Sequence, residues 1–149
     1  MSFSTKFLAG LVLAAAAPLA SAADTCAIDV TGNDALKFNT AQITVPATCK
    51  TFTINLAHIG KMPAASMGHN VVITKTADLD AVAKDGAAVK PDHVKAVDTR
   101  VIAFTKVIGG GETTSVTFDT SKLEAGGDYS FFCSFPGHWM IMKGKIVKS

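Results

Sequence analysis

The sequence lacks an excess of charge of either sign. Its 14 lysines and arginines face 12 aspartates and glutamates, and these residues are scattered along the chain. A polybasic segment of the kind that nucleic acids and anionic membranes attract is therefore missing. Internal repeats and low-complexity tracts are missing as well. Neither a nucleic-acid-binding protein nor a protein held at a membrane surface by basic residues is indicated.

Long apolar runs are also missing, and none after residue 22 approaches the ~20 residues that a membrane-spanning helix needs. One shorter run, from Phe7 to Ala17, follows Lys6 and precedes the small residues Ala20-Ser21-Ala22. This arrangement predicts a cleaved secretory signal peptide over residues 1–22. The remaining residues 23–149 carry 13 basic and 12 acidic side chains. They are expected to form one soluble, exported domain without a membrane span.

Cysteines are few and odd in number, which leaves one of the three without an internal partner. Cys26 and Cys49 both lie in the N-terminal third, whereas Cys133 lies 84 residues beyond Cys49. We therefore predict a Cys26–Cys49 disulfide and a free Cys133. Because a free thiol is a liability in an oxidising compartment, Cys133 is expected to have a ligand of its own.

Short segments in which polar and apolar residues alternate recur between turn-forming clusters. In the clearest of them, Phe52, Ile54 and Leu56 alternate with polar residues, which is typical of a half-buried strand. The expected strands are 27–30, 36–38, 42–45, 51–56, 69–75, 100–107, 114–118, 129–133 and 142–148. This pattern predicts an all-β sandwich or Greek-key barrel. Residues 76–98 differ in composition and predict a short helix with a connecting flap.

The clearest chemistry lies in a segment of ten residues near the C-terminus. Cys133, His138 and Met142 are spaced as Cys-x4-His-x3-Met. Pro136 and Gly137 lie between the first two and predict a tight turn, which places the end of one strand beside the start of the next. A thiolate, an imidazole and a thioether are therefore expected to converge on one point.

This donor set indicates copper. Cu(I) favours soft sulfur and Cu(II) accepts imidazole nitrogen, so two histidines, a thiolate and a weakly bound methionine serve both states. The second imidazole must come from His58, His69 or His93. We assign it to His69, because Gly68 precedes it at the start of an apolar strand. The carbonyl of Gly68 could approach the metal opposite Met142.

At this point the sequence resembles the azurin family of cupredoxins over essentially its whole mature length. The matching segments are Met67-Gly68-His69-Asn70, Cys133 to Gly144, Gly32-Asn33-Asp34, Phe38-Asn39-Thr40 and Arg100 to Ala103. The resemblance implies an eight-stranded Greek-key β-sandwich (cupredoxin-like) with a short helical flap.

The resemblance also implies the site. One copper ion is expected to be held by His69, Cys133 and His138, with Met142 and the Gly68 carbonyl as weak axial contacts. The disulfide of Cys26 and Cys49 matches one in the family. Residues corresponding to Asn70 and Phe135 hold the two ligand-bearing segments together and exclude water.

The function implied is single-electron transfer in the bacterial periplasm, by a monomer that is not an enzyme. The expected partners are redox proteins such as cytochrome c or copper nitrite reductase, which dock transiently at an apolar patch around His138. The ring edge of His138 is the expected point of electron exchange. The candidate patch residues are Met62, Met67, Phe135, Pro136, Trp139, Met140 and Ile141.

Three residues near these segments have open interpretations. Trp139 occupies a position where a small residue is common in the family; it either packs on neighbouring loops or enlarges the docking patch. His58 is expected to be a buried or partly buried histidine that does not bind the metal. His93, beside Pro91 and Asp92 in the flap, is expected to be solvated.

Two other classes of function, an enzyme and a copper-storage protein, fit less well. A copper oxidase or reductase needs additional histidine-rich centres, which four histidines cannot supply. A hydrolase with Cys133 as nucleophile lacks a recognisable orienting group and oxyanion site. Copper storage through Met62, Met67, Met140 and Met142 would need an open, labile site.

Overall fold

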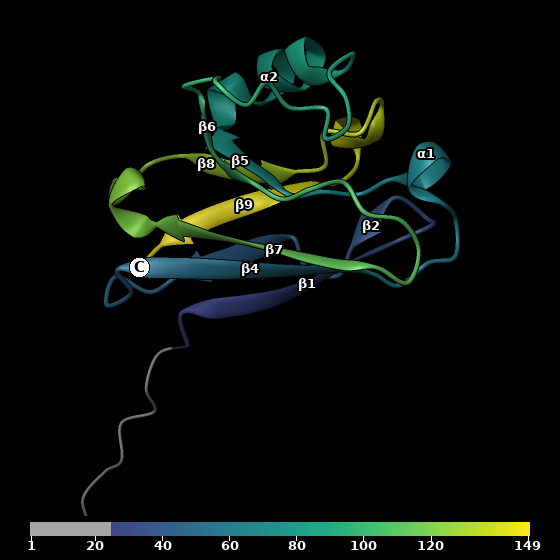
Figure 1. The fold of residues 1–149 in the computed structure, drawn as a ribbon. Helices are drawn as coiled ribbons and strands as arrows, with labels where there is room; N and C mark the ends of the chain where they lie inside the picture. The colour runs from purple at the N-terminus through teal and green to yellow at the C-terminus, as the bar shows by residue number, and fades with distance from the viewer. Residues whose placement is uncertain (1–24) are drawn as a thin grey trace, which may run out of the picture.

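A computed structural model describes residues 25–149, which form two β-sheets packed face to face (Figure 1). The predicted signal peptide, residues 1–22, lies outside the described residues. The strands are β1 (Ala27–Asn33), β2 (Lys37–Phe38), β3 (Gln42–Val45), β4 (Thr51–His58), β5 (Val72–Lys75), β6 (Val101–Phe104), β7 (Thr113–Asp119), β8 (Tyr129–Phe132) and β9 (Lys143–Lys148). The α-helices are α1 (Ala64–Met67) and α2 (Leu79–Gly86), and the 3-10 helices are η1 (Thr76–Asp78), η2 (Thr120–Lys122) and η3 (His138–Met140).

The first sheet has the strand order β2-β1-β4-β7 and the second the order β3-β9-β8-β5-β6. β1 pairs with β4 in parallel and β3 pairs with β9 in parallel, while the other pairs are antiparallel. The sheets do not join into a closed barrel within the described residues. The predicted all-β sandwich is therefore confirmed. Nine strands are present in the described chain rather than eight, and the shortest, β2, has two residues.

The core lies between the sheets and follows the alternation seen in the sequence. In β4 every second side chain is buried, from Phe52 through Ile54 and Leu56 to His58. All four residues of β8 are buried, because α2 covers the outer face of the second sheet (Figure 1). A second apolar cluster joins the helix to that face, and it contains Val72, Leu79, Val82, Ala83, Val94 and Phe132.

The short helix expected between residues 76 and 98 is confirmed as η1 and α2. Leu79, Val82, Ala83 and Gly86 are its buried residues, which is the spacing of one helical face. α1 and the 3-10 helices η2 and η3 were not expected. None of the helices that the structure describes combines the length and the hydropathy of a membrane-spanning segment.

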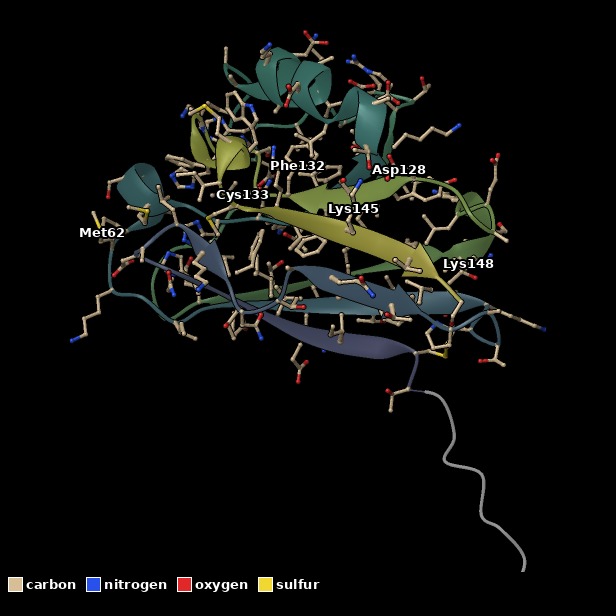
Figure 2. All side chains as sticks on the ribbon, turned by 180° about the vertical axis from the view of Figure 1, so that it is seen from behind. Met62, Asp128, Phe132, Cys133, Lys145 and Lys148 are labelled. Atoms are coloured by element: carbon tan, nitrogen blue, oxygen red, sulfur yellow. A yellow bond between two sulfur atoms is a disulfide. The ribbon has the colours of Figure 1, made fainter. Side chains whose placement is uncertain are left out.

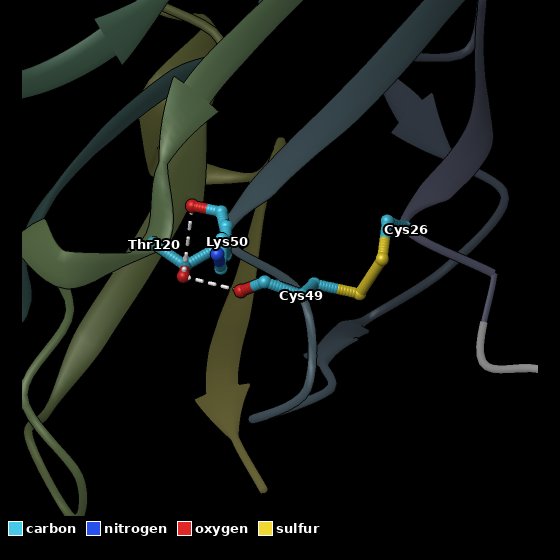
Figure 3. Close-up of a disulfide and its surroundings, with 4 residues drawn as sticks. All are labelled: Cys26, Cys49, Lys50 and Thr120. Atoms are coloured by element: carbon cyan, nitrogen blue, oxygen red, sulfur yellow. Dashed lines mark hydrogen bonds between the residues drawn. A yellow bond between two sulfur atoms is a disulfide. The ribbon is translucent and has the colours of Figure 1, made fainter.

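The predicted disulfide between Cys26 and Cys49 is present and joins the start of β1 to the residues before β4 (Figure 3). The hydroxyl of Thr120 donates to the Cys49 carbonyl at 2.6 Å, and the Lys148 ammonium donates to the Thr120 carbonyl. Cys133 and Met62 lie at the opposite end of the sandwich from Lys148 (Figure 2). The disulfide and the candidate metal ligands therefore occupy opposite ends of the fold.

Candidate metal centre

The end of the sandwich that carries Cys133 brings together two segments far apart in the sequence. Cys133 directly follows β8, and Met142 directly precedes β9. His138 begins η3 between them, while His69 lies just before β5 in an isolated bridge to Ile108. The loops between strands thus place all four candidate ligands at one end of the fold, as predicted.

The donor atoms of His69, Cys133 and His138 lie within 4.8 Å of one another, and all three residues are buried. The sulfur of Cys133 is 3.9 Å from Nδ1 of His69 and 3.6 Å from Nδ1 of His138. The Gly68 carbonyl oxygen is 3.7 Å from the same sulfur. Met142 is 1 % exposed. Three of the residues predicted from sequence, His69, Cys133 and His138, therefore meet at one enclosed point.

His69 and His138 both present Nδ1 to the sulfur of Cys133, and a hydrogen bond explains this orientation for His69. Its Nε2 is 2.9 Å from the Asn33 carbonyl, which can only accept, so Nε2 carries the proton. Nδ1 is then left unprotonated toward the sulfur, as a metal ligand must be. The ring of His58 stacks on the ring of His69, with centroids 4.2 Å apart. His58 is buried, as expected.

Backbone hydrogen bonds close the loop from Cys133 to Met142 tightly. The amide of Cys133 donates to the Met142 carbonyl at 3.0 Å, and the amide of Met142 donates to the His138 carbonyl at 2.8 Å. Gly137 has φ +84°, the left-handed conformation that glycine adopts most easily. The turn predicted around Pro136 and Gly137 is therefore present, and it fixes the spacing of the three side chains.

Gly68 lies in a crowded position beside the site. A Cβ atom there would lie 2.6 Å from the Ala64 carbonyl oxygen and 2.9 Å from a ring carbon of Phe135. Only a glycine lets the backbone approach so closely without displacing those groups. The proximity of its carbonyl to Cys133 therefore depends on the absence of a side chain.

The electrostatics of the site disfavour charge on its own side chains. Burial raises the pKa of the Cys133 thiol to about 12. Burial, and then the neighbouring His69, lowers the pKa of His138 to about 4, and burial also lowers the pKa of His69. The free protein at neutral pH therefore presents a protonated thiol and two neutral imidazoles.

Asn70 ties the two ligand-bearing segments together. Its side-chain oxygen accepts from the Ser134 amide at 2.8 Å, and its amide nitrogen donates to the Ser134 hydroxyl at 2.8 Å. The same nitrogen donates to the Asp92 carbonyl at 3.0 Å. Asn70 thus lies where the resemblance implies, next to both His69 and Cys133.

Phe135 packs against the candidate ligand His138 on one side and against His93 on another. Its ring lies 4.6 Å from that of His138, between centroids. The rings of His93 and Phe135 pack edge to face, with centroids 5.1 Å apart. The expectation that His93 is solvated was wrong: it is 2 % exposed and its Nδ1 donates to the Ala87 carbonyl at 2.8 Å. The turn that carries it folds inward over Phe135.

The candidate docking residues differ in exposure. Met140 and Ile141 are 66 % and 65 % exposed, and Met62 and Pro136 are exposed as well. Met67 and Phe135 are half-buried. Trp139 is half-buried too and packs against the cluster under α2, as in the first of its two interpretations; its role in docking stays a prediction.

His138 reaches the surface at one edge. The structure gives no hydrogen bond to its Nε2, and among the described residues the only buried side-chain nitrogen or oxygen without a partner is Thr74 Oγ1. Nε2 of His138 is therefore in contact with solvent. The residue as a whole is 6 % exposed.

Sequence reasoning missed three contributors to the site. The Asn33 carbonyl, which orients His69, is a backbone group and leaves no trace in side-chain type. Asp92 and Ser134 are short polar residues that belong to no recognisable sequence pattern, although Ser134 directly follows Cys133. Adjacency to the cysteine is the one signal that could have drawn attention to Ser134.

The donor set fits a copper ion. Metal bonds of about 2.0–2.3 Å to nitrogen and sulfur reach from one central point to donors spaced as these are. A thiolate with two imidazoles and a nearby thioether is the set that suits both Cu(I) and Cu(II). No carboxylate belongs to the cluster among the described residues, so hard cations are disfavoured.

Comparisons with known proteins agree with this chemistry. Residues 24–148 match the family described as copper binding proteins, plastocyanin/azurin family. An azurin from Alcaligenes faecalis is 63 % identical over 123 residues, which is 81 % of this chain and 96 % of that protein. An azurin from Bordetella pertussis is 54 % identical over 143 residues, 95 % of each chain.

A solved structure agrees as well. The azurin from the obligate methylotroph Methylomonas sp. strain J superposes with a TM-score of 0.81 at 45 % identity, covering 85 % of this chain and 99 % of that one. The family match, the similar azurins and the shared fold therefore agree with the buried cluster of His69, Cys133 and His138. The chain belongs to the plastocyanin/azurin family of copper-binding proteins, and within it to the azurins.

Proposed function

We propose that this protein is a periplasmic carrier of single electrons, in which His69, Cys133 and His138 hold a copper ion. Met142 and the Gly68 carbonyl would serve as additional, weaker donors. The observation that carries the proposal is the buried cluster of one sulfur and two Nδ1 atoms within 4.8 Å, in a chain of this family. Bound copper supplies a one-electron couple between Cu(I) and Cu(II).

The side chains of the site are held in place by bonds that do not depend on a metal. Asn33 fixes the His69 ring, Phe135 packs on His138, and the Cys133 amide is bonded to the Met142 carbonyl. Because these contacts exist within the protein alone, the ligands need to move little when the charge of the site changes. A small rearrangement is what fast electron exchange requires, and it supports a carrier rather than an enzyme.

Electrons are exchanged at the edge of His138 that reaches solvent. The exposed side chains of Met62, Pro136, Met140 and Ile141 surround this end of the protein and form the docking surface. An apolar surface with few ion pairs suits the short-lived contact of redox partners. The partners are cytochromes c or copper nitrite reductase, and the carrier acts as a monomer.

The location follows from the N-terminus and the cysteines. Residues 1–22 direct export and are removed, and residues 23–149 form the single functional domain. The Cys26–Cys49 disulfide is stable in an oxidising compartment such as the periplasm.

Stopped-flow mixing of the reduced copper protein with an oxidised cytochrome c tests this function. The matched variants are Met140→Lys, in the docking surface, and Val97→Lys, at a position that is 91 % exposed in the flap. We expect Met140→Lys to slow electron exchange roughly tenfold, because docking must then desolvate a charge, and Val97→Lys to have little effect. Failure of the wild type to reduce the cytochrome would refute the function. Equal effects of the two variants would refute the docking surface.

A further inference from the structure

His93 occupies an unusual position for a histidine in a surface connection. It follows α2 in the flap, is 2 % exposed, and has φ +53°, in the left-handed region that residues other than glycine rarely adopt. Its Nδ1 donates to the Ala87 carbonyl, and Nε2 lies 3.5 Å from the Lys90 ammonium. A residue held in this conformation must be fixed by its surroundings.

The ring of His93 connects the flap to a proposed copper ligand through one intermediate. It packs edge to face with the ring of Phe135, with centroids 5.1 Å apart and an interplanar angle of 72°. An edge-to-face contact of this kind is favourable and directional. Phe135 in turn packs on His138 at 4.6 Å. Three rings therefore form a continuous series from the flap to the metal site.

The residue before His93 contacts the same region independently. The carbonyl of Asp92 accepts from Asn70 at 3.0 Å and from the Ser134 hydroxyl at 3.2 Å. Its carboxylate accepts from the Val107 amide at 2.8 Å. The turn thus holds the segments that carry both proposed histidine ligands.

We propose that His93 is a positioning residue for the copper site. Its ring contact fixes the plane of Phe135, and Phe135 in turn fixes the orientation of His138 and closes the site to water. The proposal rests on the proposed function for the identity of the ligand, but the ring series consists of protein side chains alone. Residues outside a ligand set that orient its members commonly alter metal affinity by about 10–100-fold.

Two substitutions separate the ring contact from the other roles of His93. His93→Asn removes the ring, but asparagine tolerates the left-handed conformation and can still donate to the Ala87 carbonyl. His93→Phe keeps a ring against Phe135 and loses that hydrogen bond. Val94→Ala is the control: Val94 is buried on the same turn but belongs to the cluster under α2, which does not include Phe135.

The experiment measures copper affinity, the visible spectrum of the loaded protein, and the reaction of Cys133 with a thiol reagent in the copper-free protein. Cys133 is the one free cysteine, and it is buried, so its reaction reports opening of the site. We expect His93→Asn to weaken copper binding roughly tenfold and to accelerate thiol modification by a similar factor. His93→Phe should stay within about threefold of wild type in both measurements, and Val94→Ala should lower the melting temperature with little change in either.

The proposal is overturned if His93→Asn behaves as wild type, or if His93→Phe is as impaired as His93→Asn. It is also overturned if Val94→Ala changes affinity and thiol reactivity as much as His93→Asn does, since general loosening of the flap would then explain the effect. A wild type without an intense visible absorption would instead refute the proposed function. In that case thiol reactivity in the copper-free protein still decides the role of His93.

Discussion

Asn70 offers a sharp test of how the two ligand-bearing segments are held together. It is fully buried, and its amide group makes three hydrogen bonds, at 2.8, 2.8 and 3.0 Å, to Ser134 and Asp92. In Asn70→Ala the buried amide of Ser134 loses its acceptor, which costs about 1–3 kcal/mol, and each of the other two bonds contributes about 0.5–1.5 kcal/mol. We therefore expect the free energy of unfolding to fall by about 2–6 kcal/mol, a large share of the ~5–15 kcal/mol typical of a domain.

Urea unfolding of the copper-free protein measures this loss without a contribution from metal binding. Asn39→Ala is the matched control, because Asn39 is exposed and accepts a single hydrogen bond, from the Thr31 amide at 2.8 Å. That variant should lose only about 1 kcal/mol. A loss below about 1 kcal/mol in Asn70→Ala, or one no larger than in Asn39→Ala, would show that the two segments are not held by this side chain.

Three further predictions follow from the charged and polar groups. The hydrogen bond from Arg100 lowers the pKa of Asp98 to about 2. The stabilisation that the ionised Asp98 gives the folded protein is therefore present above about pH 4 and is lost as the pH falls through about 2. In urea unfolding, Asp98→Asn should cost roughly 1–2 kcal/mol at pH 7 and flatten that acid dependence. Because the thiol of Cys133 has a pKa of about 12, copper binding must release its proton. Competition titrations should therefore show the copper affinity falling about tenfold for each unit that the pH is lowered from 8 to 5. A copper affinity independent of pH would contradict this. Thr74 has a buried hydroxyl without a partner, so Thr74→Val should raise the free energy of unfolding by about 1 kcal/mol, whereas a loss of stability would reveal a missed partner.

The sheet framework and the ligand loop could be predicted because both leave local patterns. The alternation of Phe52, Ile54 and Leu56 indicates which face of β4 is buried, and burial of that face is what the structure contains. The spacing of Cys133 and His138 around a turn likewise encodes their proximity, since few backbone paths connect two neighbouring strands so shortly.

Contacts between distant segments could not be predicted in the same way. His93 lies in a polar stretch beside Pro91 and Asp92, where local composition indicates solvent; its burial depends on Phe135, 42 residues later in the sequence. The orientation of His69 depends on the carbonyl of Asn33, which any residue type could provide. Trp139 packs against the cluster under α2, whose other members come from distant parts of the sequence.

An optical redox titration of the copper-loaded protein tests the central claim most directly. The proposal requires that the Cys133 thiolate be bonded to a copper ion that takes up one electron. We predict one equivalent of copper, an intense visible absorption from thiolate-to-Cu(II) charge transfer, and its reversible loss on uptake of one electron per protein. Cys133→Ser should lack the absorption. A colourless, redox-silent complex, or an absorption that persists in Cys133→Ser, would contradict the assignment of the site.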